Sequence, residues 1–111
     1  MKTPTPLTLG DAQRAVDQWI QQWEEGYFSP LSNLARLTEE VGELARHINV
    51  AHGDKPGATD EEGLAEELGD ILFVVIALAN SMTIDLDDAL RTTLKKYQIR
   101  DAHRFTPTES E

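Results

Sequence analysis

The chain has 111 residues, a formal net charge of −10 and no cysteine. Such an acidic chain is a poor partner for nucleic-acid polymers, whose binding depends on neutralising phosphates, and without thiols it has neither disulfides nor thiolate metal sites. Its longest uninterrupted apolar run has nine residues, far fewer than the roughly 20 needed to cross a bilayer, and the first ten residues hold no apolar signal-peptide core. We expect one domain without membrane contact, located in the cytoplasm.

The first helix is predicted over residues 9–24. Thr8 and Asp11 have the spacing of a capping box at its start, and a glycine follows its expected end. Trp19 and Trp23 lie one turn apart on its apolar side. Core packing is the ordinary explanation for such a pair. The functional alternative is that Trp23 helps to stack a nucleobase.

The second helix is predicted over residues 30–51, after a serine and a proline suited to the N-cap and the first helical position. Glu40 and Glu43 lie one turn apart on this helix, beside its apolar stripe. His47 follows Glu43 by four residues, so the Glu-x-x-His pattern of di-iron carboxylate bundles is missing. We expect His47 to pair with the acidic residues, and a substrate contact is the alternative.

The third helix carries a second pair of carboxylates. Residues 53–58 are predicted to form a loop, and Thr59 is predicted to cap a helix that ends near Ser81 and is the most buried of the chain. Glu67 and Asp70 again lie one turn apart, and the apolar run that follows indicates that both point toward the core. Four inward carboxylates on two helices repel one another unless they are partly protonated or share a divalent cation. The shared cation is the sharper hypothesis.

The fourth helix is predicted over residues 86–100, capped by Asp85. Four of its residues are expected to face inward: Ala89, Leu90, Leu94 and Tyr97. Residues 91–104 carry five basic side chains and one acidic one. Lys96 and Arg100 lie one turn apart in this segment and form either a phosphate-binding row or a solvated face.

No segment alternates with the period of a strand. We therefore predict an all-α, four-helix bundle. Its domain spans residues 9–104, with a lead of residues 1–8 and a flexible tail of residues 105–111.

The predicted chemistry follows from the types of side chain that come together. Oxygen ligands without cysteine or Glu-x-x-His favour Mg²⁺ or Mn²⁺ over zinc or iron. A carboxylate cluster near a row of cations suits the hydrolysis of a nucleoside polyphosphate. A nucleotide-driven motor or switch is not expected, because the chain lacks a Gly-rich loop that ends in Lys-Ser/Thr.

These motifs resemble a known family. Glu39-Glu40-x-x-Glu43, followed after 23 residues by Glu67-x-x-Asp70, resembles the signature of the MazG-like nucleotide pyrophosphohydrolases. This family lies in the all-α NTP pyrophosphatase superfamily, with dimeric dUTPases and phosphoribosyl-ATP pyrophosphohydrolases. The resemblance extends from about residue 10 to 105 and includes four further segments: EGYFSPL, RLTEEVGELAR, EELGDILFVVIALANSMTIDLDDAL and KKYQIRDAHRF.

The resemblance implies that the chain hydrolyses a (d)NTP between the α- and β-phosphates to a nucleoside monophosphate and pyrophosphate. It assigns the ligands of Mg²⁺, for which Mn²⁺ is a possible substitute, to four carboxylates: Glu40, Glu43, Glu67 and Asp70. It implies that Glu39 orients or deprotonates the attacking water. It also implies phosphate and sugar contacts by three polar side chains: Asn80, Lys96 and Arg100.

The resemblance further implies a homodimer or a homotetramer, and a third helix with so much apolar surface agrees with a partner subunit. Two other functions remain open at this stage. One is hydrolysis of phosphoribosyl-ATP by the same acidic helices. The other is a non-catalytic helical module that senses a nucleotide or binds a protein with its acidic face.

Overall fold

The computed structural model describes residues 3–52 and 61–108, and it is built from helices. There are four of them: α1 (Leu9–Gln21), α2 (Pro30–His52), α3 (Glu61–Ser81) and α4 (Leu86–Arg100). No strand occurs within the described ranges, so the prediction of an all-α, four-helix chain is confirmed. The predicted loop at 53–58 and the predicted cap Thr59 lie outside the described residues.

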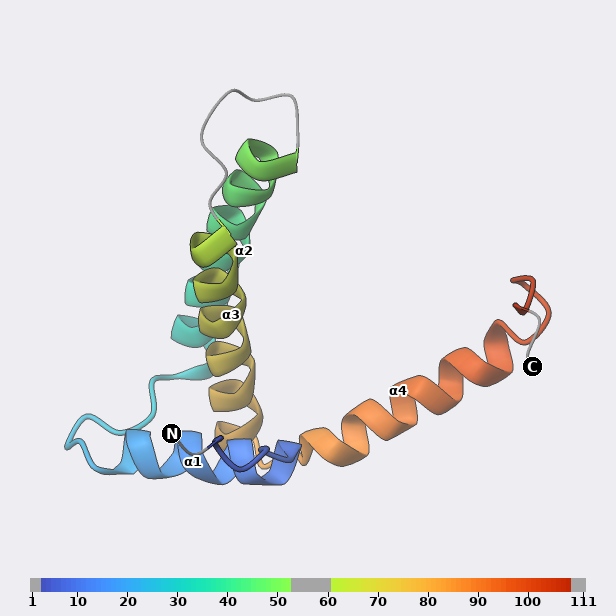
Figure 1. Cartoon of the computed structure of the whole chain (residues 1–111). Helices are drawn as coiled ribbons and strands as arrows, with labels where there is room; N and C mark the ends of the chain where they lie inside the picture. The colour runs from blue at the N-terminus through green and yellow to red at the C-terminus, as the bar shows by residue number, and fades with distance from the viewer. Residues whose placement is uncertain (1–2, 53–60, 109–111) are drawn as a thin grey trace.

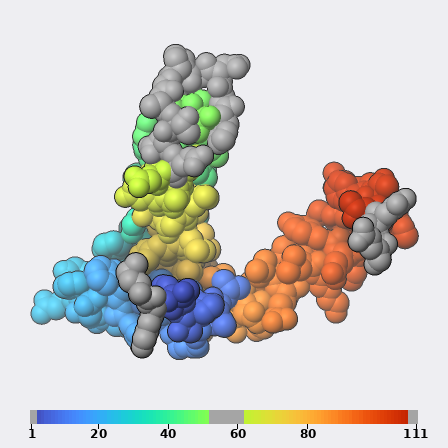
Figure 2. Space-filling model, viewed as in Figure 1, coloured from blue at the N-terminus to red at the C-terminus, as the bar shows by residue number. Residues whose placement is uncertain are grey.

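The fold has three parts (Figure 1): the hairpin of α2 and α3, which we call the column; α1, which we call the foot; and α4, which we call the arm. α2 and α3 run side by side in opposite directions, α1 lies across the end of this hairpin, and α4 projects away from it. The space-filling view in Figure 2 shows α4 as a separate arm, with an open angle between it and the column. The radius of gyration is 17.8 Å, whereas a compact chain of this length has about 13 Å.

Local sequence signals set the ends of the first helix. The predicted capping box is present: the Asp11 amide donates to the Thr8 hydroxyl over 3.0 Å, and the Thr8 amide donates to the Asp11 carboxylate over 3.2 Å. α1 ends at Gln21, earlier than predicted. The chain then turns, and Gly26 adopts φ of +61°, a left-handed conformation that glycine takes without steric cost.

The caps of α2 and α4 also follow the prediction. The Ser29 hydroxyl accepts a hydrogen bond from the Ser32 amide over 3.1 Å at the start of α2. The Asp85 carboxylate accepts from the amides of Asp87 and Asp88 over 2.9 and 3.4 Å at the start of α4. Side-chain oxygens therefore satisfy backbone amides that the first turn of each helix leaves without a helical partner.

The core is small and centred on α3. Its buried apolar residues are Ile20 of α1 and four residues of α3: Val74, Ile76, Ala77 and Ala79. The prediction that α3 is the most buried helix is therefore confirmed.

Among the described residues no single helix is long and apolar enough to cross a bilayer. One bent pair, Glu62–Ser81 with Leu86–Arg100 at 106°, meets that test by length and composition alone.

Two predictions about buried side chains are wrong for the single chain. Trp19 and Trp23 are 54% and 50% exposed instead of packed in the core. The predicted inward face of α4 is exposed because the arm packs mainly against the foot. Leu90, Leu94 and Tyr97 are between 45% and 53% exposed. The accessible surface is 9173 Å², whereas about 6,100 Å² is usual for a folded monomer of this mass. The excess is about 3,000 Å², and large apolar side chains of all four helices are among the exposed residues.

Gln13 of α1 fixes the corner from which α4 departs. Its side-chain amide donates to Asn80 Oδ1 and to the carbonyl of Ile84, and its Oε1 accepts from the amide of Leu86, each over 2.9 Å. Asn80 Nδ2 donates in return to the Gln13 carbonyl over 2.9 Å. One side chain thus connects the end of α3, the turn and the start of α4.

Substitution of Gln13 by alanine is expected to lower the free energy of unfolding by about 1–3 kcal/mol, because it leaves polar groups of Asn80 and Leu86 without partners. Amide hydrogen exchange at Leu86 should accelerate in the same variant. Chemical denaturation and exchange measured by NMR check both effects. Alanine at the exposed Gln18 of the same helix is the matched control, and equal behaviour of the two variants would contradict this role of Gln13.

Candidate metal and nucleotide site

Packing of α2 against α3 brings carboxylates of the two helices together. Oxygens of Glu40, Glu67 and Asp70 all lie within 4.8 Å of one another, and all three residues are partly buried. Glu67 and Asp70 share a face because they are one turn apart, and the antiparallel hairpin places this face against Glu40 of α2. These three carboxylates form what we call the acidic triad.

A second group overlaps the acidic triad. Ligand atoms of Glu43, His47 and Glu67 also lie within 4.8 Å of one another, so Glu67 belongs to both groups. The four carboxylates predicted to act together therefore meet as two overlapping sets with Glu67 in common. Glu39, predicted to act on water, belongs to neither set and is exposed on α2.

The side chain of Glu67 lies in an environment that suits a metal ligand. Its Oε2 is completely buried and has no hydrogen-bond partner among the described residues, while its Oε1 lies 4.0 Å from His47 Nε2. A buried carboxylate oxygen without a partner is costly, and a bound divalent cation would compensate that cost. The donor atoms of the acidic triad are all oxygens, as Mg²⁺ and Mn²⁺ prefer. The residues present thus fit a divalent metal ion.

The pKa of Glu40 also reflects this crowding. Partial burial raises the pKa of its carboxyl group, and the neighbouring carboxylates Glu67 and Asp70 raise it further. Both effects penalise the charged form of Glu40. A cation between the three groups would reverse the penalty.

A cavity of about 430 Å³ opens where the end of α1 meets α2 and α3. Its walls include five aromatic residues: Trp19, Trp23, Tyr27, Phe28 and Phe73. The two tryptophan rings meet edge to face, with centroids 5.5 Å apart. The Arg36 guanidinium lies 5.7 Å from the centroid of the Phe73 ring and adds a cation to the wall. Apolar walls with a few polar groups are typical of a small-molecule site.

The aromatic cavity and the acidic triad are neighbours along the same two helices. Arg36 precedes Glu40 by one turn on α2, and Phe73 follows Asp70 by one turn on α3. The sequence analysis considered Trp23 as a residue that stacks on a nucleobase. It did not identify Arg36, Tyr27 or Phe73 as part of the same cavity. The one-turn spacings to the carboxylates were the signal that could have found Arg36 and Phe73.

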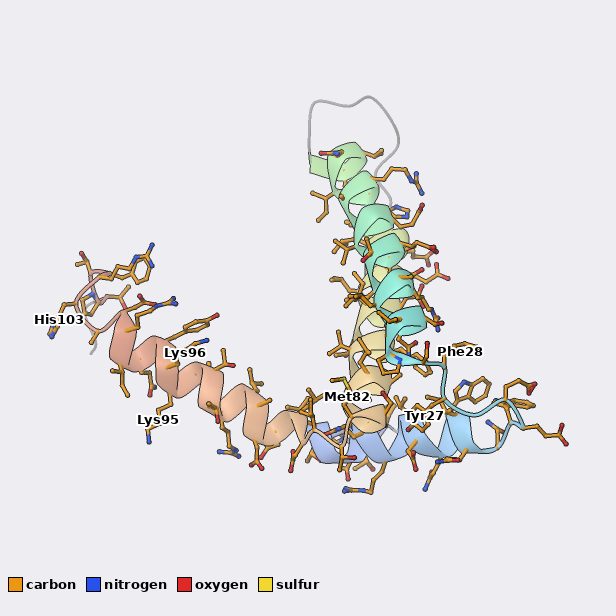
Figure 3. All side chains as sticks on the ribbon, turned by 180° about the vertical axis from the view of Figure 1, so that it is seen from behind. Tyr27, Phe28, Met82, Lys95, Lys96 and His103 are labelled. Atoms are coloured by element: carbon orange, nitrogen blue, oxygen red, sulfur yellow. The ribbon has the colours of Figure 1, made fainter. Side chains whose placement is uncertain are left out.

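The three predicted substrate contacts do not join the acidic triad within one chain. Asn80 exchanges hydrogen bonds with Gln13, as described above. Lys96 and Arg100 lie on the α4 arm, where both pack over the Tyr97 ring at 5.3 and 4.8 Å; Figure 3 shows Lys96 well away from the column. Arg100 also pairs with Asp101 over 3.0 Å.

Comparison with known proteins shows the family to which a chain with this arrangement of helices and carboxylates belongs. The pattern of the MazG nucleotide pyrophosphohydrolase domain matches residues 28–105, which include α2, α3, α4 and both ligand groups. The chain belongs to the MazG nucleotide pyrophosphohydrolase family. It is therefore a hydrolase that acts on nucleotides, and the resemblance seen in the sequence is confirmed.

Two relatives match this chain over nearly their whole length, whereas a third is about twice as long as the matched part. The uncharacterized protein YpjD of Bacillus subtilis (strain 168) is 48% identical over 104 residues, which cover 92% of this chain and 94% of YpjD. A crystal structure of the Bacillus-conserved MazG protein, a nucleotide pyrophosphohydrolase, superposes with a TM-score of 0.75 at 47% identity, over 85% of this chain and 93% of that one. The dCTP pyrophosphatase 1 of Bos taurus is 33% identical over 90 residues, which are 75% of this chain but only 53% of the relative.

Proposed function

We propose that this MazG protein hydrolyses nucleoside triphosphates, (d)NTPs, at the α–β phosphate bond in a Mg²⁺-dependent reaction. The products are a nucleoside monophosphate and pyrophosphate, and the role is the cleansing or control of the nucleotide pool. The observation that carries the proposal is the acidic triad, with the buried and unpartnered Oε2 of Glu67, directly beside an aromatic cavity.

Each part of the site has a task in this proposal. Glu40, Glu67 and Asp70 hold Mg²⁺, with Glu43 close by, and Mn²⁺ is a possible substitute. The bound ion would neutralise phosphate charge and lower the pKa of a water molecule. Glu39, next to Glu40 on α2, orients or deprotonates the attacking water once the substrate is bound. Exposure in the free chain leaves its side chain able to turn.

The aromatic cavity holds the nucleobase in this proposal. Its volume, about 430 Å³, lies in the range of small-ligand pockets. Trp19, Trp23 and Tyr27 offer ring faces for stacking, which stabilises a bound base without reading its identity. Arg36 lines the cavity and precedes Glu40 by one turn on α2, so it would meet the sugar or the α-phosphate. The activity of the dCTP pyrophosphatase relatives makes dCTP the first substrate to test.

A second copy of the chain completes the site. The α4 face is apolar and exposed, and an excess surface of about 3,000 Å² per chain exceeds the roughly 800 Å² per partner of a standard interface, as in large obligate assemblies. Figure 3 shows Lys96 well away from the α2–α3 column, and Arg100 follows it by one turn on α4. In a subunit assembly these two side chains would contact phosphates in an active site at the subunit boundary. We therefore propose a homodimer or a homotetramer, with Asn80, Lys96 and Arg100 as phosphate and sugar contacts. Asn80 also exchanges hydrogen bonds with Gln13 and thereby helps to fix the start of α4.

The experiment that tests the proposed reaction is pyrophosphate release from a panel of canonical and modified (d)NTPs, with Mg²⁺ or with EDTA. Phosphoribosyl-ATP belongs to the panel because some members of the superfamily hydrolyse it. Release only with metal, and with a ranking among (d)NTPs, supports the proposal. Binding of the Mg²⁺-nucleotide without any product would instead favour a nucleotide-sensing module.

Acid is expected to inhibit the enzyme by protonating Glu40, whose pKa is raised, in competition with the metal ion. The value of kcat/KM should fall as the pH decreases through the raised pKa of Glu40, and additional Mg²⁺ should partly restore it. The metal-free protein should show the opposite trend in stability. Because the folded state binds this proton more tightly than the unfolded state, its free energy of unfolding should fall as the pH rises above about 4.5.

Steady-state rates at several Mg²⁺ concentrations and denaturation curves in EDTA measure these two trends. Glu40→Gln, which cannot titrate, is the control for stability and should flatten that pH dependence. An acid limb of activity that does not respond to Mg²⁺ would contradict the competition between proton and metal.

A further inference from the structure

His47 lies beside the carboxylates of the acidic triad, and the proposed function gives it no task. It follows Glu43 by one turn on α2, so the two side chains share a helix face. Its Nε2 lies 4.0 Å from Glu67 Oε1 on α3, and the side chains of His47 and Glu67 are only 13% and 16% exposed. One imidazole nitrogen and two carboxylates therefore converge, all within 4.8 Å.

We propose that Glu43, His47 and Glu67 form a second metal position, of mixed nitrogen and oxygen donors, that takes a transition-metal dication such as Mn²⁺ or Co²⁺. It lies next to the carboxylate-only position of Glu40, Glu67 and Asp70, and Glu67 bridges the two. The inference deepens the proposed function, because it rests on the same metal cluster and assigns it a second ion of a different chemical class.

The chemistry of the donors separates the two positions. Imidazole nitrogen is a good ligand for Mn²⁺, Co²⁺ and Zn²⁺, whereas Mg²⁺ prefers oxygen ligands and retains water. The Glu43–His47 pair resembles other metal sites in which two ligands four residues apart project from one helix face.

Glu67 supplies the link between the two positions. Its Oε1 is the oxygen nearer to His47 Nε2, and its Oε2 is completely buried without a hydrogen-bond partner among the described residues. A carboxylate that bridges two cations gives one oxygen to each. Such a bridge would use both oxygens of Glu67 and would explain why a carboxylate is buried here at all.

The positively charged side chain of Arg46 contacts two residues of the proposed second metal position, Glu43 and His47. Its Nη2 donates to Glu43 Oε2 over 3.1 Å and lies 3.5 Å from His47 Nε2. The Arg46 and Glu43 side chains are 53% and 50% exposed. An ion pair so exposed to solvent contributes little to stability, so a dication can displace the guanidinium at small cost.

Pulsed EPR of the Mn²⁺-loaded, full-length protein tests the second position directly, because a coordinated imidazole gives a characteristic ¹⁴N modulation. The modulation is expected in the wild-type protein and absent in His47→Gln. His103, which Figure 3 shows near the far end of the α4 arm, provides the matched control: His103→Gln should retain the modulation. Calorimetric titration should show a loss of Mn²⁺ affinity in His47→Gln of about tenfold or more, with little change for Mg²⁺.

The outcomes of these experiments distinguish a failure of the second metal position from a failure of the proposed metal-dependent function. Mn²⁺ that binds the wild-type protein without ¹⁴N modulation, or modulation that survives in His47→Gln, would overturn the nitrogen-containing position and leave the carboxylate-only position standing. Absence of any bound Mn²⁺ and Mg²⁺ would instead overturn the metal dependence of the proposed function itself. Equal loss of Mg²⁺ and Mn²⁺ affinity in His47→Gln would reduce His47 to a hydrogen-bond partner of Glu67 and also overturn the inference.

Discussion

Replacement of Glu40 by glutamine, or of Asp70 by asparagine, is expected to lower kcat/KM for nucleotide hydrolysis by about 10³-fold or more. Either change keeps the shape of the side chain but removes a charged metal ligand from the acidic triad. Metal stabilisation of transition-state charge is worth several kcal/mol, and each 1.36 kcal/mol corresponds to about a tenfold change in rate. Steady-state kinetics at saturating Mg²⁺, with calorimetry of Mg²⁺ binding, measures the loss.

The fold is expected to survive these substitutions. Glu40 repels Glu67 and Asp70 in the metal-free protein and has a raised pKa for that reason among others. The neutral variant should therefore unfold in EDTA at a temperature equal to or above that of the wild type. Glu66→Gln, at an exposed position next to Glu67, is the matched control and should keep full activity. Near wild-type activity of Glu40→Gln and Asp70→Asn would show that the metal assignment is wrong.

Glutamate in place of Leu94 is expected to dissociate the assembly and to reduce activity by about 10²-fold or more. Leu94 is 53% exposed in the single chain and shares the apolar α4 face with Leu90 and Tyr97. If a second copy covers this face, the variant buries an unpaired charge, at a cost of several kcal/mol that a subunit interface seldom tolerates. Light scattering coupled to size-exclusion chromatography reports the assembly, and the pyrophosphate assay reports the activity.

The matched control for this variant is Thr92→Glu, which adds the same charge on the opposite side of α4 at another exposed position. It should keep both assembly and activity. The helical content of Leu94→Glu should persist by circular dichroism, because the buried core lies in α1 and α3 and not in α4. A wild-type chain that stays monomeric at micromolar concentration would contradict the proposed assembly.

The sequence predicted those features of the fold that depend on neighbouring residues. Capping by Thr8, Ser29 and Asp85 is a local interaction, so the starts of α1, α2 and α4 could be placed to the residue. The end of α1 was predicted at Glu24, near Gly26, but the helix ends at Gln21 and a turn precedes Gly26. Prediction of α3 as the most buried helix followed from its apolar run and is also borne out.

Helical periodicity shows which residues share a face but not what covers that face. For this reason the prediction placed Leu94 inward and favoured core packing for Trp19 and Trp23, whereas the single chain leaves all three about half exposed. The same limit applies to Asn80, whose partner Gln13 is 67 residues away in the sequence. Contacts of this kind arise from tertiary packing and cannot be predicted from a local sequence pattern.

The candidate site was predictable to the extent that its residues repeat at one-turn spacing. The two carboxylate pairs on α2 and α3 do meet, and the place of Glu67 at the overlap of two groups emerged only from the packed hairpin. The aromatic cavity needed three separate segments to come together, so sequence reasoning reached only Trp23.

The most direct test of the proposed reaction is a ³¹P NMR time course of the purified protein with dCTP and Mg²⁺. The account predicts that the triphosphate signals give way to dCMP and pyrophosphate. It also predicts no conversion in EDTA and at most a trace with Glu40→Gln. Formation of dCDP and inorganic phosphate would contradict cleavage at the α–β bond, and metal-independent conversion by Glu40→Gln would contradict the role of the acidic triad.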